Sequence, residues 1–161
     1  MSFLHYILKT FDKISPSKIA YAHCDIPCGI YDPHLAQMAT HTVIRMTSLI
    51  SETKDDTHKI ARLTAVKEQH AEIVKHEIRI LWGDYFKPEH VQKYPQLHDL
   101  VWKVMKLGSK VKQEVNMEVA EELLESVNKI AEIFWKTKGC DTYRVAAPHP
   151  TARETVYPIL K

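Results

Sequence analysis

Apolar residues between positions 34 and 138 recur with a helical period in four separate stretches. Within each stretch they lie three or four positions apart, which places them along one side of an α-helix. The four stretches cover about residues 34–52, 57–82, 95–114 and 116–138. Amphipathic helices joined by short connections pack as antiparallel neighbours. The sequence therefore predicts an all-α fold, an up-down-up-down four-helix bundle.

The chain offers few residues for turns, with 4 glycines and 8 prolines in 161 positions. This disfavours a sandwich or barrel of many strands, which needs a turn every ~8–12 residues. Asp32 is expected to cap the first helix with Pro33 at its first position, and Gly83 to end the second helix. Residues 139–161 contain three prolines and no helical period, so we expect an irregular C-terminal tail.

Charge and cysteine content limit the possible partners and the compartment. Lysine and arginine number 22 and aspartate and glutamate 20, for a net charge of +2. This balance predicts no nucleic-acid partner. No apolar run approaches the ~18 residues of a membrane span, and we expect no membrane partner. Three cysteines cannot form a scaffold of several disulfides, which indicates a reducing compartment and a cytoplasmic location.

Residues 1–22 differ in character from the rest of the chain. Their lysines follow a short apolar run, whereas a secretory signal places its positive charges first, so export is the less favoured alternative. Ala20, Tyr21 and Ala22 have the small-x-small form of a processing site. Composition alone leaves two interpretations open, an ordinary N-terminal helix with a linker and a leader removed on maturation.

The segment HCDIPCGIYDP, residues 23–33, fits neither a helix nor a strand and carries two of the three cysteines. The spacing of Cys24 and Cys28 is by itself compatible with a redox pair, half of a zinc site or coincidence. A structural zinc site takes four ligands, commonly from a second Cys or His pair at close spacing, and an iron–sulfur cluster normally takes four cysteines. The chain has no second cysteine pair.

A different metal suits this segment if the mature chain begins at His23. The His23 amine, the Cys24 amide nitrogen and the thiolates of Cys24 and Cys28 then form a square of two nitrogens and two sulfurs. The His23 imidazole can reach an axial position. A tetragonal field of this kind suits nickel or copper. Two thiolates and an anionic amide stabilise a higher oxidation state, which allows nickel to cycle between +2 and +3.

This segment resembles the metal hook of nickel superoxide dismutases, and all nine fixed positions of the hook motif match. Further similarity lies in four blocks, so that the resemblance spans about residues 23–138. The blocks are residues 66–69, 81–88, 93–98 and 133–138.

The resemblance implies a fold, a reaction and a maturation step. The implied fold is the four-helix bundle preceded by an irregular metal hook, and the implied assembly is a homohexamer. A processing protease would cut between Ala22 and His23. The mature enzyme would disproportionate superoxide to dioxygen and hydrogen peroxide. It would hold one nickel ion per subunit on His23, Cys24 and Cys28. A non-catalytic nickel or copper binder that uses the same hook is the alternative.

The resemblance also assigns roles beside the metal. Tyr31 would screen the open axial face, Asp25 would help to hold the loop, and Tyr85 would lie next to the site. The Ile26–Pro27 peptide bond would be cis, a form that X-Pro bonds permit.

This sequence departs from the family where the axial histidine is braced. A glutamate and an arginine of the family are replaced by Ala39 and His70, which leaves Gln37, Thr40 or His70 as the brace.

Lysines could also attract the substrate, because a positive rim raises the encounter rate of an anion such as superoxide. The sequence offers Lys67, Lys87 and Lys93 for this role.

Overall fold

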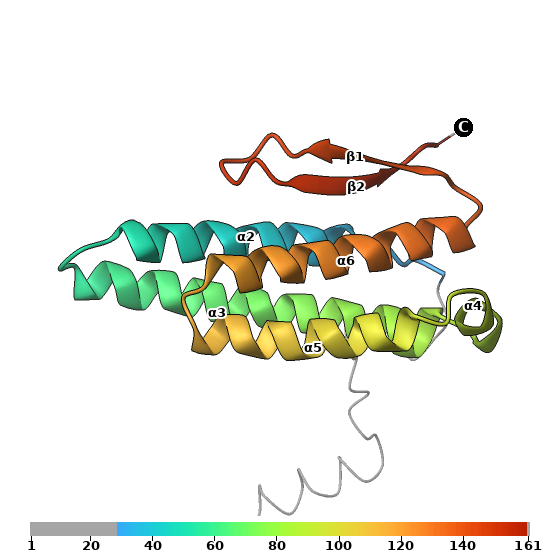
Figure 1. The fold of residues 1–161 in the computed structure, drawn as a ribbon, viewed down its shortest axis with the longest axis horizontal. Coiled ribbons are helices and arrows are strands. Elements are labelled where there is room, and N and C mark those ends of the chain that lie inside the picture. The colour runs from blue at the N-terminus through green and yellow to red at the C-terminus, as the bar shows by residue number, and fades with distance from the viewer. Residues whose placement is uncertain (1–28, 161) are drawn as a thin grey trace, which may run out of the picture.

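The computed structural model describes residues 29–160 and confirms the four-helix bundle. The long helices are α2 (His34–Glu52), α3 (Thr57–Ile80), α5 (Leu97–Gln113) and α6 (Met117–Thr137). Helix α2 packs against α3 and α6, and α5 packs against the same two helices, which closes the bundle (Figure 1). In the described part of the chain, no helix is both long and apolar enough to cross a membrane.

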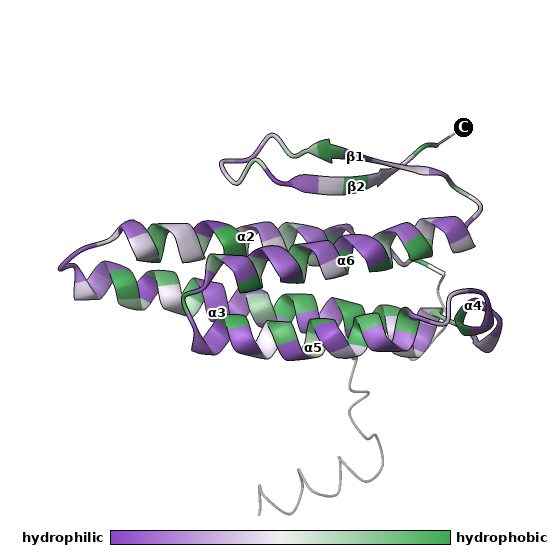
Figure 2. Ribbon diagram, in the orientation of Figure 1, coloured by the Kyte–Doolittle hydropathy of each residue, from purple (hydrophilic) through white to green (hydrophobic). Residues whose placement is uncertain are grey.

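The core lies on the inner sides of the four helices. Apolar residues alternate with polar ones along each helix, as an amphipathic element requires (Figure 2). Val43, Val74, Ile78, Leu123 and Phe134 each come from an inner face and are fully buried. The helical period in the sequence therefore identified the core.

Side chains of the expected type begin the helices. The Asp32 carboxylate accepts a hydrogen bond from the His34 amide at 2.7 Å, and Pro33 has helical backbone angles of −76° and −7°. Asp56 and Asn116 cap α3 and α6 by accepting from the backbone three residues on. The predicted cap at Asp32 is thus confirmed, with the regular helix starting at His34.

Gly83 does not end the second helix. Instead α3 runs into a π-helical turn, η1 (Leu81–Tyr85), which closes with a hydrogen bond from the Phe86 amide to the Leu81 carbonyl at 2.9 Å. A short helix, α4 (Pro88–Lys93), follows where no helix was predicted, and α5 begins two residues beyond Pro95. The wide turn changes the direction of the chain at this end of the bundle, and Tyr85 contacts Phe134 of α6.

The prediction of an irregular tail was wrong. The strands β1 (Thr142–Ala146) and β2 (Glu154–Pro158) form an antiparallel hairpin in which Thr142 pairs with Pro158. The prolines at 148 and 150 lie in the connection, and Pro158 ends β2, so none of them interrupts the ladder. Two strands of only five residues each leave little signal in the sequence, and the three prolines outweighed it.

The hairpin covers α2 and α6 as a third layer (Figure 1). Residues Thr155 and Val156 of β2 are buried there. The Gln37 amide of α2 donates to the Val156 carbonyl at 3.1 Å, and the Asn128 amide of α6 donates to the Glu154 carbonyl at 2.9 Å. Two buried amide side chains thus bind the backbone of β2.

His41 makes a further contact between α2 and the hairpin. Its two ring nitrogens hydrogen-bond the hydroxyls of Thr151 and Thr155 at 2.8 and 2.7 Å. Burial, together with the charges of the nearby His149 and His34, lowers the pKa of His41 to about 4. The neutral imidazole is therefore the form that α2 presents to the hairpin.

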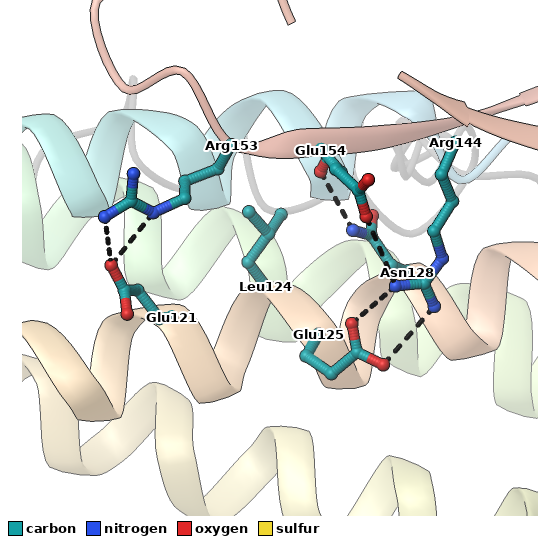
Figure 3. A pocket seen from close by; sticks show the side chains of 7 residues that line it. All are labelled: Glu121, Leu124, Glu125, Asn128, Arg144, Arg153 and Glu154. Atoms are coloured by element: carbon teal, nitrogen blue, oxygen red, sulfur yellow. Dashed lines mark hydrogen bonds and ion pairs between the residues drawn. The ribbon is translucent and has the colours of Figure 1, made fainter. Parts of the chain in front are cut away.

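Arginines of the hairpin pair with glutamates of α6 (Figure 3). Arg144 donates to Glu125 at 2.6 Å and to Glu132 at 2.7 Å, and its hydrogen bond lowers the pKa of Glu125. Arg153 binds Glu121 at 2.5 and 2.9 Å. Arg144 is 28% exposed and Arg153 48%, so water screens the Arg153 pair more strongly.

We expect Arg144→Ala to lower the free energy of unfolding by about 1–2 kcal/mol, because it removes charge-assisted hydrogen bonds to two partly buried carboxylates. The matched change Arg153→Ala should cost less than about 0.5 kcal/mol. Urea unfolding of both variants, followed by circular dichroism, checks this. Equal losses in the two variants would contradict the assignment of Arg144 as the main ionic contact of the hairpin.

Candidate functional site

The predicted ligand segment begins just before the described part of the chain. His23, Cys24, Asp25 and Cys28 lie outside the described residues, as does the predicted cis bond at Ile26–Pro27. The first site residue that the structure describes is Tyr31, three positions after Cys28. Its surroundings therefore show where the segment joins the bundle.

Tyr31 and Tyr85 lie together at the end of the bundle where α2 begins. Their ring centroids are 5.4 Å apart and the ring planes meet at 49°. Tyr31 comes from the segment before α2, and Tyr85 from the last position of η1. The structure thus brings together the two tyrosines that were predicted to share a site, although 54 positions separate them in the sequence.

Tyr85 is fixed from several sides. Its ring packs against Phe134 at 4.6 Å and stacks on His90 at 5.7 Å. Its hydroxyl lies 2.6 Å from the Thr137 hydroxyl, which donates its own proton to the Phe134 carbonyl at 2.6 Å. Thr137 has a single proton to give, so Tyr85 is the donor in their hydrogen bond. This arrangement orients both the ring and the hydroxyl of Tyr85.

The sequence analysis missed two of these neighbours, His90 and Thr137. Thr137 lies in the block of residues 133–138 that carried part of the family resemblance. That block was a usable signal, because similarity to the family at the end of α6 indicated a role for these residues beyond packing in the core. His90 lies on α4, a helix that the periodicity did not predict, so no pattern pointed to it.

The positions that replace the family's brace have different surroundings. Ala39 is buried, and the Thr40 hydroxyl donates to the Ala36 carbonyl at 2.7 Å. His70 donates from Nδ1 to the Val66 carbonyl at 2.8 Å, which leaves Nε2 as its second hydrogen-bonding atom. Gln37 is 1% exposed, and its Oε1 has no hydrogen-bond partner among the described residues. The Thr40 hydroxyl uses its proton locally but keeps its acceptor lone pairs, so Gln37, Thr40 and His70 all stay candidates for the brace.

Lys67 does not belong to a positive rim, and that prediction was wrong. Its side chain is 1% exposed, and Nζ donates to the Glu114 carbonyl at 2.6 Å, just past the end of α5. Burial lowers the pKa of Lys67. A lysine in this place satisfies a carbonyl at a helix C-terminus. Lys87 and Lys93 are exposed, and Lys93 lies 5.5 Å from the centroid of the Tyr94 ring.

Among residues 29–160, no group of three or more His, Cys, Asp or Glu side chains is arranged to hold a metal ion. Cys140 is a free cysteine of intermediate exposure at the junction between α6 and the hairpin. Its amide donates to the Trp135 carbonyl at 3.0 Å.

Comparison with known proteins identifies the family of this chain. The family model described as nickel-containing superoxide dismutase matches residues 18–138. The superoxide dismutase [Ni] of Streptomyces coelicolor is 40% identical over 124 residues, which is 77% of this chain and 94% of that protein. The enzyme of the same name from Streptomyces seoulensis gives the same identity and coverage.

A native nickel superoxide dismutase structure is similar to this chain in fold as well. The TM-score is 0.69 at 41% identity, over 73% of this chain and 99% of that one. The family match ends at residue 138, so the hairpin lies beyond it.

Proposed function

Because the chain belongs to the nickel-containing superoxide dismutase family, we propose that its nickel centre is a hook of residues 23–28, completed by cleavage between Ala22 and His23. The chain is a nickel-dependent superoxide dismutase, an oxidoreductase that converts two superoxide ions and two protons to dioxygen and hydrogen peroxide. One observation carries the proposed centre, the order His-Cys-Asp-Ile-Pro-Cys-Gly at residues 23–29, which ends two positions before Tyr31.

The donor atoms of this segment fit nickel. Two thiolates, an amide nitrogen, an amine and an imidazole form the nitrogen and sulfur field that suits a tetragonal metal ion. His23, Cys24 and Cys28 would supply all of these donors. Bound there, nickel supplies redox cycling between the +2 and +3 states. The family match begins at residue 18, ahead of His23, which supports a family precursor that continues upstream of the hook.

The surrounding residues would control access to this centre. Tyr31 follows Cys28 by three positions and packs on Tyr85, so the two rings would form an aromatic wall beside the proposed hook. Thr137 and His90 hold Tyr85 in place. Tyr31 would thereby screen the open face of the centre and limit access to small molecules. Asp25 would help to hold the loop, as the resemblance implies.

We further propose a homohexamer in the cytoplasm. Exposed large apolar side chains support subunit contacts, since apolar and aromatic side chains are common in the core of subunit interfaces. Ile30 is 79% exposed, Leu35 53% and Trp102 64%. The small number of cysteines supports a reducing compartment.

Mass spectrometry of the protein from its native host tests the proposed centre. We expect His23 as the first residue, one nickel ion per subunit, six subunits in the native particle, and rapid removal of superoxide. A mature chain that still carries residues 1–22 and holds nickel would overturn the proposed ligand set. Nickel or copper bound at His23 without any superoxide removal would favour the metal-binding alternative.

A further inference from the structure

Lys138 places its ammonium group against the tyrosine pair. Its Nζ lies 4.8 Å from the centroid of the Tyr85 ring and 5.8 Å from that of Phe134. The Tyr85 ring also contacts Tyr31, and the two ring centroids are 5.4 Å apart. Lys138 and Tyr31 therefore contact the same ring, that of Tyr85, and Tyr31 lies three positions after Cys28 of the proposed hook.

The charge of Lys138 is not neutralised by a carboxylate in the described part of the chain. Other lysines of the bundle form ion pairs with glutamates, namely Lys75, Lys103, Lys112 and Lys129. Lys138 instead lies over aromatic faces, which hold a cation without cancelling its charge. The residue is exposed and follows the C-terminus of α6, where the partial negative charge of the helix favours a cation.

The substrate of this enzyme is an anion, so an uncompensated cation near the centre affects its approach. Charges act over a Debye length of about 10 Å at 0.1 M salt. A positive charge at the entrance raises the rate at which an anion meets the site. We propose that Lys138 is the electrostatic guide that draws superoxide to the face of the centre lined by Tyr31 and Tyr85. This role rests on the hook proposed above.

Lys136 provides a matched control. It is an exposed lysine in the last turn of α6, two positions before Lys138. Lys136 lines a different hollow, together with Tyr94, Leu100 and Glu132. Replacing either lysine by glutamine changes the net charge by the same amount. A difference between the two variants therefore reports the position of the charge.

The test measures kcat/KM for superoxide with nickel-loaded mature protein, at salt concentrations from about 0.01 to about 0.3 M. At low salt we expect Lys138→Gln to lower kcat/KM about threefold to fivefold and Lys138→Glu about tenfold. Lys138→Arg should stay near the unmodified protein, and Lys136→Gln within about 1.5-fold of it. The differences should shrink as salt rises.

Two results would overturn the proposal that Lys138 guides superoxide to the centre. One is a loss in Lys138→Gln that is the same at every salt concentration, which would indicate a packing role beside Tyr85. The other is an equal loss in Lys136→Gln, which would indicate net charge alone. Each comparison is made between active, nickel-loaded proteins, so it holds whichever residues bind the metal. If the proposed hook is wrong, this appears in a separate measurement, because variants that lack the proposed ligands would still retain nickel.

Discussion

Replacing Cys24 by serine will leave a mature protein without measurable superoxide dismutase activity, and Cys28→Ser will do the same. A neutral hydroxyl cannot replace the thiolate that stabilises the oxidised metal. Loss of an outer-shell partner commonly costs about 10–100-fold in metal affinity or activity, and loss of a direct ligand should cost more than that. We expect both variants to lose nickel and to remain below 1% of the unmodified rate, or about 100-fold down.

Cys140→Ser is the control for these two variants. Cys140 lies at the junction with the hairpin, where its amide donates to the Trp135 carbonyl and its sulfur lies 3.9 Å from the Lys138 carbonyl, a weak contact that a serine hydroxyl can replace. This variant should keep both its nickel and its activity. Metal analysis and superoxide removal are measured together on all three proteins. Full activity in Cys28→Ser would exclude the proposed centre.

The second large effect concerns the N-terminus. In the chain of 161 residues the nitrogen of His23 is part of the Ala22–His23 peptide bond. An amide is a much poorer donor than an amine, because it must lose a proton before it binds a metal. The leader would also pass through the place of the metal. We therefore expect the full chain to be inactive, with at least about a 100-fold lower rate than the form that begins at His23.

Three forms of the protein test this expectation. They are the full chain, a chain that begins at His23, and a chain with one additional alanine before His23. The additional alanine removes the His23 amine while leaving no bulky leader, so it separates loss of a ligand from steric blocking. Only the form that begins at His23 should be strongly active after nickel is added. Equal activity of the full chain would show that the His23 amine is not a ligand.

The helical bundle was predictable because its core lies on one side of each helix. A period of 3.6 residues is a local property, so residues such as Val74 and Ile78 can be assigned from the sequence alone. The π-helical turn was not predictable in the same way. Gly83 has the sequence features of a helix end, and whether the chain stops there depends on how Tyr85 packs against Phe134. That contact joins positions 49 apart.

The tail and Lys67 show a second limit. A pairing such as that of Arg144 with Val156 leaves little trace in two strands of five residues. Lys67 was read as a surface cation because lysine is rarely buried, whereas the end of α5 supplies a carbonyl that accepts its proton. One signal for the hairpin was present in α2, which has Arg45 and Glu52 as its only charged residues apart from histidines. A helix with a free outer face normally carries more charge.

The proposed site was recognisable because its ligands are adjacent in the sequence. His23, Cys24 and Cys28 form a short motif, so no fold is needed to bring them together. Tyr85, Thr137 and Lys138 are different, since only the folded bundle brings Tyr85 to Tyr31 and brings Thr137 and Lys138 to Tyr85. Family resemblance assigned a role to Tyr85 and marked the block that contains Thr137 and Lys138, but the contacts of these two residues required the structure.

The hairpin also affects the order in which the molecule can be completed during synthesis. Helix α2 is the first helix of the bundle to leave the ribosome, yet Gln37 and His41 find partners in Val156 and Thr155, 119 and 114 positions later. A nascent chain that has reached residue 138 contains all four helices, while Gln37 and His41 still lack their partners in β2. The helix that is synthesised first is therefore completed only once the segment beyond residue 138 has been made. A chain that stops at about residue 138 would keep the four helices and expose these polar groups of α2.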